Sequence, residues 1–217
     1  MEDFYRIARM TAPLDPHLID QLAGVETATI GHFEPLGFFS AAIRPVFPAR
    51  IAGRAVTVAA PGRDGRIIYA AIDSLVPGDV LVIARLDDDD IACVGGGVTA
   101  AAKAKGAAGI IVDGPCTDPS EIIANGLPVW CRGISAKTTS RRIAIGGAIN
   151  HPIACGGAPV LAGYCVLADE SGVFAAEAPH MALVARKALE RQKVSIKVRA
   201  HLQAGKSIFD FDREHNQ

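Results

Sequence analysis

Short runs of aliphatic residues recur along the chain, and each run is bounded by glycine, proline or charged residues. The runs are rich in Val and Ile, whose branched side chains favour extended backbone. The pattern therefore predicts many short strands. The expected strands are residues 54–59, 80–84, 110–112, 128–133, 143–145, 153–155, 158–161, 164–168 and 172–176.

Apolar positions with helical spacing occur mainly at the two ends of the chain. A helix is predicted to start near Asp15, a good N-cap residue, and helices are also expected over residues 67–75, 98–105 and 180–204. Helices thus come first and last, with strands concentrated between them, and no linker or internal repeat interrupts the order. The sequence predicts one α/β domain over residues 1–217, with a C-terminal helix over about 180–204.

Composition and charge narrow the class of protein. Half of the residues are hydrophobic and the formal net charge is −1, so neither nucleic acid nor an anionic membrane is an expected partner. No run approaches the ~18 apolar residues of a membrane span. The chain begins with an acidic segment that lacks the apolar core of a signal peptide. A cytoplasmic protein is expected.

The spacing of the cysteines and histidines argues against a zinc site. The five cysteines are odd in number and none form a Cys-x-x-Cys pair, and the six histidines are scattered without ligand spacing. Buried free thiols are the expected state of the cysteines. Cys116 lies in a polar loop and has a nucleophilic alternative, although no histidine is placed beside it by sequence.

The most informative stretch runs from residue 95 to residue 121. Three consecutive glycines open an alanine-rich helix, so bare N–H groups and the positive end of the helix dipole form an expected anion site. After the strand at 110–112 comes a polar loop that carries two carboxylates. The candidate substrate-binding residues are Gly95, Gly96, Gly97, Val98 and Thr99, with Cys116 from the loop.

Two roles are possible for the carboxylates of this loop, Asp118 and Glu121. Their oxygen atoms suit a divalent cation whose coordination is completed by water. Alternatively, Asp118 only caps a helix that begins at Pro119, because an aspartate before a proline is a common helix start. Arg132 and Lys137 flank the next loop and can either bring positive charge to the site or face solvent.

Several motifs together resemble a known family. They are Pro-Gly-Asp-Val-Leu-Val-Ile at 77–83, the glycines at 95–97 with the helix that follows, Gly-Ile-Ile-Val-Asp-Gly at 109–114, the Asp-x-x-Glu at 118–121, and Ala-Asp-Glu-Ser-Gly-Val at 168–173. Over about residues 20–205 the chain resembles the regulator of ribonuclease activity A, whose family includes the 4-hydroxy-4-methyl-2-oxoglutarate aldolases.

The resemblance implies a fold, an assembly and a site. The implied fold is an αββα sandwich of the swivelling type, assembled as a homotrimer or hexamer with sites at subunit interfaces. The aldolase members use Mg²⁺ or Mn²⁺ to stabilise a pyruvate enolate. By resemblance Asp118 takes the position of the metal-binding aspartate, and the N–H groups of Gly97 and Val98 take those that hold the substrate carboxylate.

The same resemblance exposes several departures. Thr117 stands in place of the signature arginine, Gly96 in place of an acidic residue, and His32 in place of an amino-terminal aspartate. An acid contributed by a neighbouring subunit has no sure match, and Glu190 and Ser195 are the nearby positions. Threonine cannot make the bidentate contacts of arginine. Weak or absent activity on 4-hydroxy-4-methyl-2-oxoglutarate is therefore expected.

Three functional hypotheses follow. The first is a lyase, of aldolase or decarboxylase type, that acts on a small oxo- or hydroxy-carboxylate with Mg²⁺ or Mn²⁺; its candidate catalytic residues are Asp118, Thr117 and His32, and its metal ligands are Asp118 and Glu121. The second is a non-catalytic trimeric regulator that binds a ribonuclease or another partner. The third is a metal-independent enzyme of another class that uses the same interface pocket. The glycine-rich anion site modestly favours an enzyme.

Overall fold

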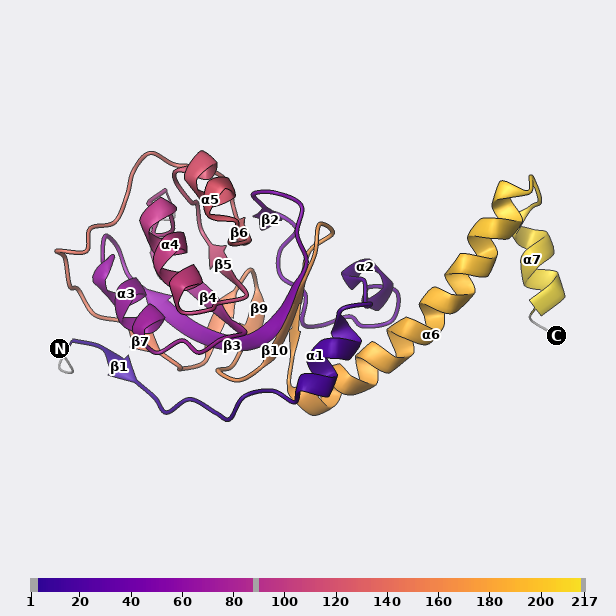
Figure 1. The fold of residues 1–217 in the computed structure, drawn as a ribbon, viewed down its shortest axis with the longest axis horizontal. Coiled ribbons are helices and arrows are strands. Elements are labelled where there is room, and N and C mark those ends of the chain that lie inside the picture. The colour runs from indigo at the N-terminus through magenta and orange to yellow at the C-terminus, as the bar shows by residue number, and fades with distance from the viewer. Residues whose placement is uncertain (1–3, 88–89, 216–217) are drawn as a thin grey trace.

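The computed structural model describes residues 4–87 and 90–215, and its centre is a mixed β-sheet (Figure 1). Across the sheet the strands lie in the order β1-β7-β3-β4-β5-β6-β2, with β10 and β11 joined to it beside β3, while β8 and β9 form a separate hairpin. The strands are β1 (Arg6–Ile7), β2 (Arg44–Pro45), β3 (Ile51–Ala60), β4 (Asp79–Arg85), β5 (Gly109–Asp113), β6 (Val129–Cys131), β7 (Ala148–Ile149), β8 (Ile153–Cys155), β9 (Ala158–Val160), β10 (Cys165–Ala168) and β11 (Val173–Ala176).

The helices fall into two groups. Strands β3, β4, β5 and β6 run parallel to one another, and such strands need crossover connections, which α3, α4 and α5 supply in turn. The remaining helices come from the two ends of the chain. The helices are α1 (Pro16–Leu22), α2 (Thr27–Ile30), α3 (Arg66–Asp73), α4 (Gly96–Ala104), α5 (Pro119–Asn125), α6 (Ala178–Gln203) and α7 (Ile208–His215).

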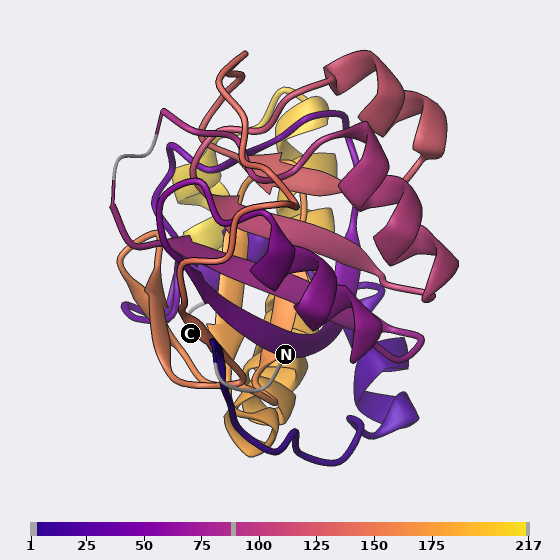
Figure 2. The ribbon, with the colours of Figure 1, turned by 90° about the vertical axis from the view of Figure 1, so that its left-hand side faces the viewer.

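The central strands are buried on both faces. On one face, Ile68 and Ile72 of α3 and Val98 of α4 belong to a core that includes Leu81 and Ile110. On the other face, the β8–β9 hairpin and neighbouring segments form a second core with the sheet. Figure 2 shows the hairpin and the crossover helices on opposite sides of the sheet. Because both faces are covered, these strands appear in the sequence as nearly continuous aliphatic runs.

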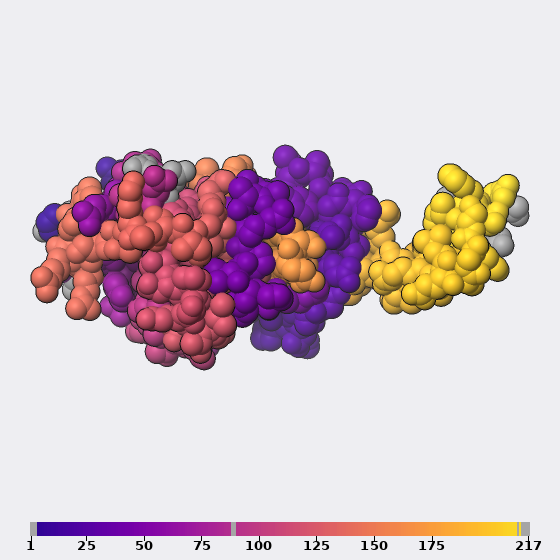
Figure 3. Space-filling model, turned by 90° about the horizontal axis from the view of Figure 1, so that it is seen from above, coloured from indigo at the N-terminus to yellow at the C-terminus, as the bar shows by residue number. Residues whose placement is uncertain are grey.

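The first half of α6 packs against the body, and the second half projects from it. Met181, Val184 and Ala188 are buried in a third core that also contains residues of α1, α2, β10 and β11. Beyond them α6 extends away from the rest of the molecule and α7 folds back beside its end (Figures 1 and 3). Large apolar side chains are exposed on this arm: Val194, Ile196, Leu202 and Phe209. None of the helices in the described ranges is long and apolar enough to cross a membrane.

The structure confirms the predicted mixed α/β class and corrects some local expectations. The expected strand at 143–145 is wrong, because the described backbone there pairs with no strand. Instead, the carboxylate of Asp64 accepts hydrogen bonds from the N–H groups of Ile145 (2.6 Å) and Gly146 (3.2 Å). Helix α7 was not predicted.

A buried ion pair joins the two longest strands of the sheet. Arg54 of β3 and Asp79 of β4 are register partners, with exposed fractions of 6% and 2%. The guanidinium Nε and Nη2 atoms lie 2.9 and 3.0 Å from the two carboxylate oxygens. Asp79 also accepts the N–H of Val76 (3.0 Å), and Arg54 donates to the carbonyl of Thr11. The pair therefore ties the start of β4 to β3 and to the N-terminal segment.

We expect Asp79→Asn to lower the free energy of unfolding by ~3–5 kcal/mol, because it leaves a buried guanidinium without its counter-charge. The matched control is Asp73→Asn, which removes the exposed ion pair between Asp73 and Lys105 and should cost ~1 kcal/mol or less. Urea unfolding followed by circular dichroism measures both. Equal small losses for the two variants would show that the Arg54–Asp79 pair does not stabilise the sheet.

Candidate functional site

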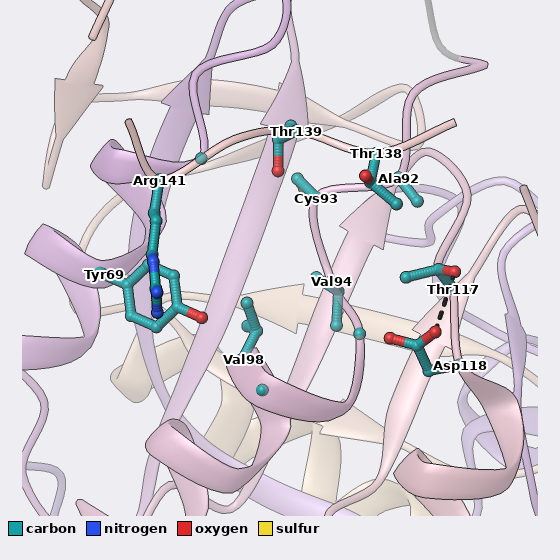
Figure 4. A pocket seen from close by; sticks show the side chains of 13 residues that line it. Tyr69, Ala92, Cys93, Val94, Val98, Thr117, Asp118, Thr138, Thr139 and Arg141 are labelled. Atoms are coloured by element: carbon teal, nitrogen blue, oxygen red, sulfur yellow. Dashed lines mark hydrogen bonds between the residues drawn. The ribbon is translucent and has the colours of Figure 1, made fainter. Parts of the chain in front are cut away.

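A cavity of about 270 Å³ lies beyond the carboxyl ends of β4 and β5 (Figure 4). This is the edge at which ligands usually bind in parallel α/β sheets. Figure 4 shows Thr117 and Asp118 on one side, Tyr69 and Arg141 on the opposite side, and Val94 and Val98 between them. The remaining lining residues are Gly65, Ala92, Cys93, Gly95, Gly97, Thr138 and Thr139.

The start of α4 forms the floor of this cavity. The first backbone bond of the helix runs from the N–H of Thr99 to the carbonyl of Gly95 (3.0 Å). In the described part of the chain, the N–H groups of Gly97 and Val98 have no acceptor. Free N–H groups at the positive end of a helix bind anions. The hydroxyl of Thr99 is turned away, since it donates to the carbonyls of Gly95 and Gly96.

The carboxylate of Asp118 points into the cavity. One oxygen accepts the N–H of Gly96 and the other accepts the Thr117 hydroxyl, each over 3.3 Å. The backbone of Asp118 is left-handed (φ 52°), and its side chain makes no capping hydrogen bond to α5. The alternative that Asp118 only caps this helix is therefore wrong. A left-handed aspartate before a proline is uncommon, and such conformations cluster at functional sites.

The glycines at positions 95 and 96 let the loop approach this closely. A Cβ atom on Gly95 would lie 2.6 Å from an Asp118 carboxylate oxygen, and one on Gly96 would lie 1.8 Å from a Glu121 carboxylate oxygen. Glu121 thus occupies the space beside Gly96, at the position where the family resemblance expects an acid. The two carboxylates lie against consecutive residues of one backbone segment.

The carboxylates of the site suit some divalent cations and not others. Within residues 4–87 and 90–215, no three His, Cys, Asp or Glu side chains converge as a metal site. A closed zinc site therefore does not fit. Mg²⁺ is commonly held by one or two carboxylates and completes its shell with water and substrate oxygens. The Asp118 carboxylate in the cavity fits a cation of that kind, and Glu121 packs against the adjacent Gly96.

Five residues proposed from the sequence are not among the lining residues of the cavity: His32, Gly96, Thr99, Cys116 and Glu121. His32 is exposed just after α2 and is not among the lining residues. Cys116 is fully buried and does not line the cavity either; its sulfur atom lies 3.4 Å from that of Cys131. The structure therefore brings Thr117, Asp118 and the α4 start together in one chain, and it leaves His32 outside.

The positively charged side chain that lines the cavity was not predicted from the sequence. Arg132 and Lys137, the two candidates, form ion pairs with Asp113 and Asp90. Arg141 reaches the cavity instead, and it forms no ion pair with any described residue. Nothing in the local sequence separates Arg141 from the adjacent Arg142.

Backbone pairing places Arg141 there. The segment that carries it forms isolated bridges between Ala92 and Thr138 and between Asp64 and Ser140. The N–H of Ser140 donates to the carbonyl of Arg63 (3.0 Å), and the N–H of Gly65 donates back to Ser140 (3.2 Å). These contacts hold the segment over the cavity. They also bring it close to α3, which supplies Tyr69.

Comparison with known proteins places the chain among related sequences and folds. The RraA-like family, described as Aldolase/RraA, matches residues 17–175. A protein of Halalkalibacterium halodurans named "Putative 4-hydroxy-4-methyl-2-oxoglutarate aldolase" is 34% identical over 143 residues, which cover 66% of this chain and 67% of that protein.

Two solved structures have similar folds. Streptomyces coelicolor RraAS2, described as an unusual member of the RNase ES inhibitor RraA protein family, superposes with a TM-score of 0.77 at 25% identity, covering 87% of this chain and 98% of that one. A protein of Pseudomonas syringae pv. tomato superposes with a TM-score of 0.82 at 20% identity, covering 96% and 98%. The second likeness concerns the fold alone.

We expect Gly96→Ala to destabilise the protein by ~1–3 kcal/mol, although alanine is the better helix former. The added methyl group meets the Glu121 side chain, including its Cβ atom at 2.8 Å. Gly97→Ala is the matched control, because its Cβ would meet only the Tyr69 hydroxyl at 3.3 Å, and we expect a change within ~1 kcal/mol. Thermal unfolding compares the two. A stabilised Gly96→Ala would mean that Glu121 does not pack over this residue.

Proposed function

This chain belongs to the RraA-like, Aldolase/RraA, family, and we propose that it is a carbon–carbon lyase acting on a small oxo- or hydroxy-carboxylate in the cavity beside Asp118. One observation carries the proposal: the cavity combines two free N–H groups at a helix start, a carboxylate and a guanidinium without an ion-pair partner among the described residues. A protein that only masks a partner does not need this combination.

The cavity offers two places for negative charge on a substrate. A carboxylate binds to the N–H groups of Gly97 and Val98, where the dipole of α4 adds to the hydrogen bonds. Arg141, on the opposite side, takes the role of the positive charge that Thr117 lacks. Its fork of donors can hold a second carboxylate or the oxygen of an enolate in a bidentate contact.

The proposed reaction is a retro-aldol cleavage of a 4-hydroxy-2-oxo acid. A base takes the proton of the 4-hydroxyl group, the bond between C3 and C4 breaks, and its electron pair forms the enolate of the 2-oxo acid product. The other product leaves with a new carbonyl group, and the enolate then takes a proton at C3. Arg141 and the α4 N–H groups stabilise the negative charge, which is the most effective contribution that such a site makes.

Asp118 and Glu121 are the residues that would hold Mg²⁺ or Mn²⁺. When bound, such a cation polarises the 2-oxo group as a Lewis acid. Without a cation, Asp118 is still the carboxylate in the cavity that can accept a proton. The third hypothesis, a metal-independent enzyme, thus differs from the first in whether turnover requires the cation.

A binding role has its own support. The chain is similar to RraAS2 over most of both lengths, and the projecting arm exposes apolar side chains such as Val194 and Ile196. Exposed apolar patches commonly mark protein contacts. Assembly as a homotrimer or hexamer, which would cover such side chains, is part of our proposal. A regulator of a ribonuclease is the alternative function.

Release of a 2-oxo acid from a panel of 4-hydroxy-2-oxo acids, with Mg²⁺, Mn²⁺ or a chelator, tests the proposed function. We expect turnover on at least one compound, weak on 4-hydroxy-4-methyl-2-oxoglutarate, and roughly 10²-fold slower in Asp118→Asn. The melting temperature of this variant should change little, because the Asp118 side chain does not cap α5. The control is Asp20→Asn, which changes an exposed residue of α1. Its turnover and melting temperature should match those of the wild type.

The outcomes separate the three hypotheses. Turnover that survives the chelator supports the metal-independent enzyme. Wild-type protein that cleaves no compound of the panel contradicts the lyase and leaves the binding regulator. Equal turnover of wild type and Asp118→Asn would place the chemistry elsewhere.

We further expect Arg141→Gln to raise KM roughly 10- to 100-fold, because the substitution removes a hydrogen bond between charged groups. Arg142→Gln removes the same charge from the adjacent exposed residue, which does not line the cavity, so its KM should stay at the wild-type value. Steady-state kinetics on the substrate found above measures both. An equal effect of the two substitutions would indicate a general loss of positive charge rather than a contact with Arg141.

A further inference from the structure

Two cysteine side chains meet directly behind the site loop. Cys116 follows β5 and Cys131 ends β6, and these two strands are parallel neighbours in the sheet. Their sulfur atoms lie 3.4 Å apart, and the residues are 0% and 4% exposed. The backbones are also tied, since the N–H of Cys116 donates to the carbonyl of Gly133 (2.9 Å). Two thiols in contact can be joined by a disulfide when their sulfur atoms approach each other further.

The other cysteines lack such a partner. Burial raises the pKa of the Cys93 thiol to about 11 and that of Cys165 to about 12, and it raises the pKa of Cys155 well above its usual value. For Cys131 the hydrogen bond with the Cys116 thiol lowers the pKa below its usual value, while burial acts in the opposite direction. Since the thiolate is the reactive form of cysteine, Cys131 differs chemically from the three isolated thiols.

We propose that Cys116 and Cys131 are a redox modification site, which a hydroperoxide converts to a disulfide and a thiol reductant restores, and that the disulfide displaces Thr117 and Asp118. This proposal goes beyond the proposed lyase activity. Formation of the disulfide is independent of that activity, and only its effect on turnover rests on it.

The chemistry balances with hydrogen peroxide as the oxidant. The thiolate of Cys131 attacks one peroxide oxygen, the O–O bond breaks and hydroxide leaves, so Cys131 becomes a sulfenic acid. The sulfur of Cys116 then attacks, its proton leaves with the sulfenic oxygen as water, and the S–S bond forms. The two thiols lose two electrons in total. The peroxide is reduced to two waters once the hydroxide takes up a proton.

Disulfide formation must bring the two sulfur atoms closer together. A disulfide bond is about 2.05 Å long, so the sulfurs must approach by roughly 1.3 Å from their separation of 3.4 Å. Cys131 belongs to a strand that pairs on both sides, with β5 and β2, and the adjacent Trp130 is fully buried. Cys116 lies in the connection between β5 and α5. The Cys116 backbone is also bridged on two sides, by Val94 and Ile134, so the approach of the sulfur atoms strains both segments. The strain on the Cys116 segment passes directly into Thr117, the next residue of the chain.

A movement of Cys116 reaches the cavity within two residues. The N–H of Thr117 donates to the carbonyl of Val94 (2.8 Å), and Asp118 accepts the N–H of Gly96 over 3.3 Å. Both contacts anchor the loop to the start of α4. A misplacement of about 1 Å in a catalytic group can cost roughly 10²-fold in rate. Oxidation therefore is expected to lower turnover, and reduction to restore it.

The test treats the full-length protein with hydrogen peroxide and then with dithiothreitol. We expect the wild type to lose the mass of two hydrogen atoms and two of its five thiols. Peptide mapping should show a disulfide between Cys116 and Cys131. Fluorescence of the single tryptophan, Trp130, should fall on oxidation and recover on reduction, because the new disulfide is next to it in the chain. Turnover should fall tenfold or more and recover in parallel.

Two variants make the test specific. Cys131→Ala should keep its fluorescence and, under reducing conditions, its turnover, and it should form no disulfide at Cys116. Cys165→Ala removes an equally buried cysteine that has no sulfur neighbour among the described residues, and it should respond to peroxide as the wild type does. If Cys131→Ala fails to fold, Cys116→Ala removes the other thiol of the pair and serves in its place.

Several results would overturn the proposal. They are retention of all thiols after peroxide, a link between other cysteines, or an irreversible gain of oxygen at Cys131 in place of the link. If the disulfide forms but turnover does not change, the redox site stands and its effect on Asp118 is refuted. If no substrate of the proposed lyase is found, the mass and fluorescence measurements still decide whether the site exists.

Discussion

The close approach of two backbone segments, residues 95–97 and 116–121, is the constraint on which the candidate site depends. No side chain at Gly95 or Gly96 separates them, and the space beside each glycine is filled by Asp118 and Glu121. Helix α5 is secured to α4 at its other end, where the side-chain amide of Asn125 donates to the Gly96 carbonyl and the Thr99 hydroxyl, each over 2.9 Å. The carboxylates are therefore held against a helix start whose own N–H groups remain open.

The parallel sheet explains why these segments meet. Strands β4 and β5 run in the same direction, so the connections that follow them emerge at the same edge. A third segment, around 138–141, is added there by bridges to residues 92 and 64. This segment supplies Arg141, while Glu121 lies where the family resemblance expects an acid. Charges of the same kinds as those missing at positions 117 and 96 thus return from other parts of the chain.

The same geometry links the site to the sheet behind it. Cys116 connects β5 to the loop that carries Asp118, and its sulfur contacts a residue of β6. A chemical change at this contact reaches the loop directly, because Cys116 is followed by Thr117 and Asp118. The arm formed by α6 and α7 lies far from this region (Figure 1), and it carries exposed apolar side chains such as Val194 and Ile196.

The sequence by itself determined the elements whose signals are local. The runs that became β4 and β5 are aliphatic because they are covered on both faces, and the three glycines before residue 98 mark the start of α4. The same local motifs were sufficient to indicate the family.

Only the tertiary structure decided which side chains share the cavity. Arg141 could not be separated from Arg142, Lys137 or Arg132, because the difference lies in pairing with residues distant in the sequence. The apolar run at 143–145 is not a strand because its N–H groups bond to the Asp64 carboxylate instead of another strand. Likewise, whether Asp118 caps α5 or faces α4 depends on its left-handed backbone and on the glycines opposite, and no spacing in the sequence encodes that direction.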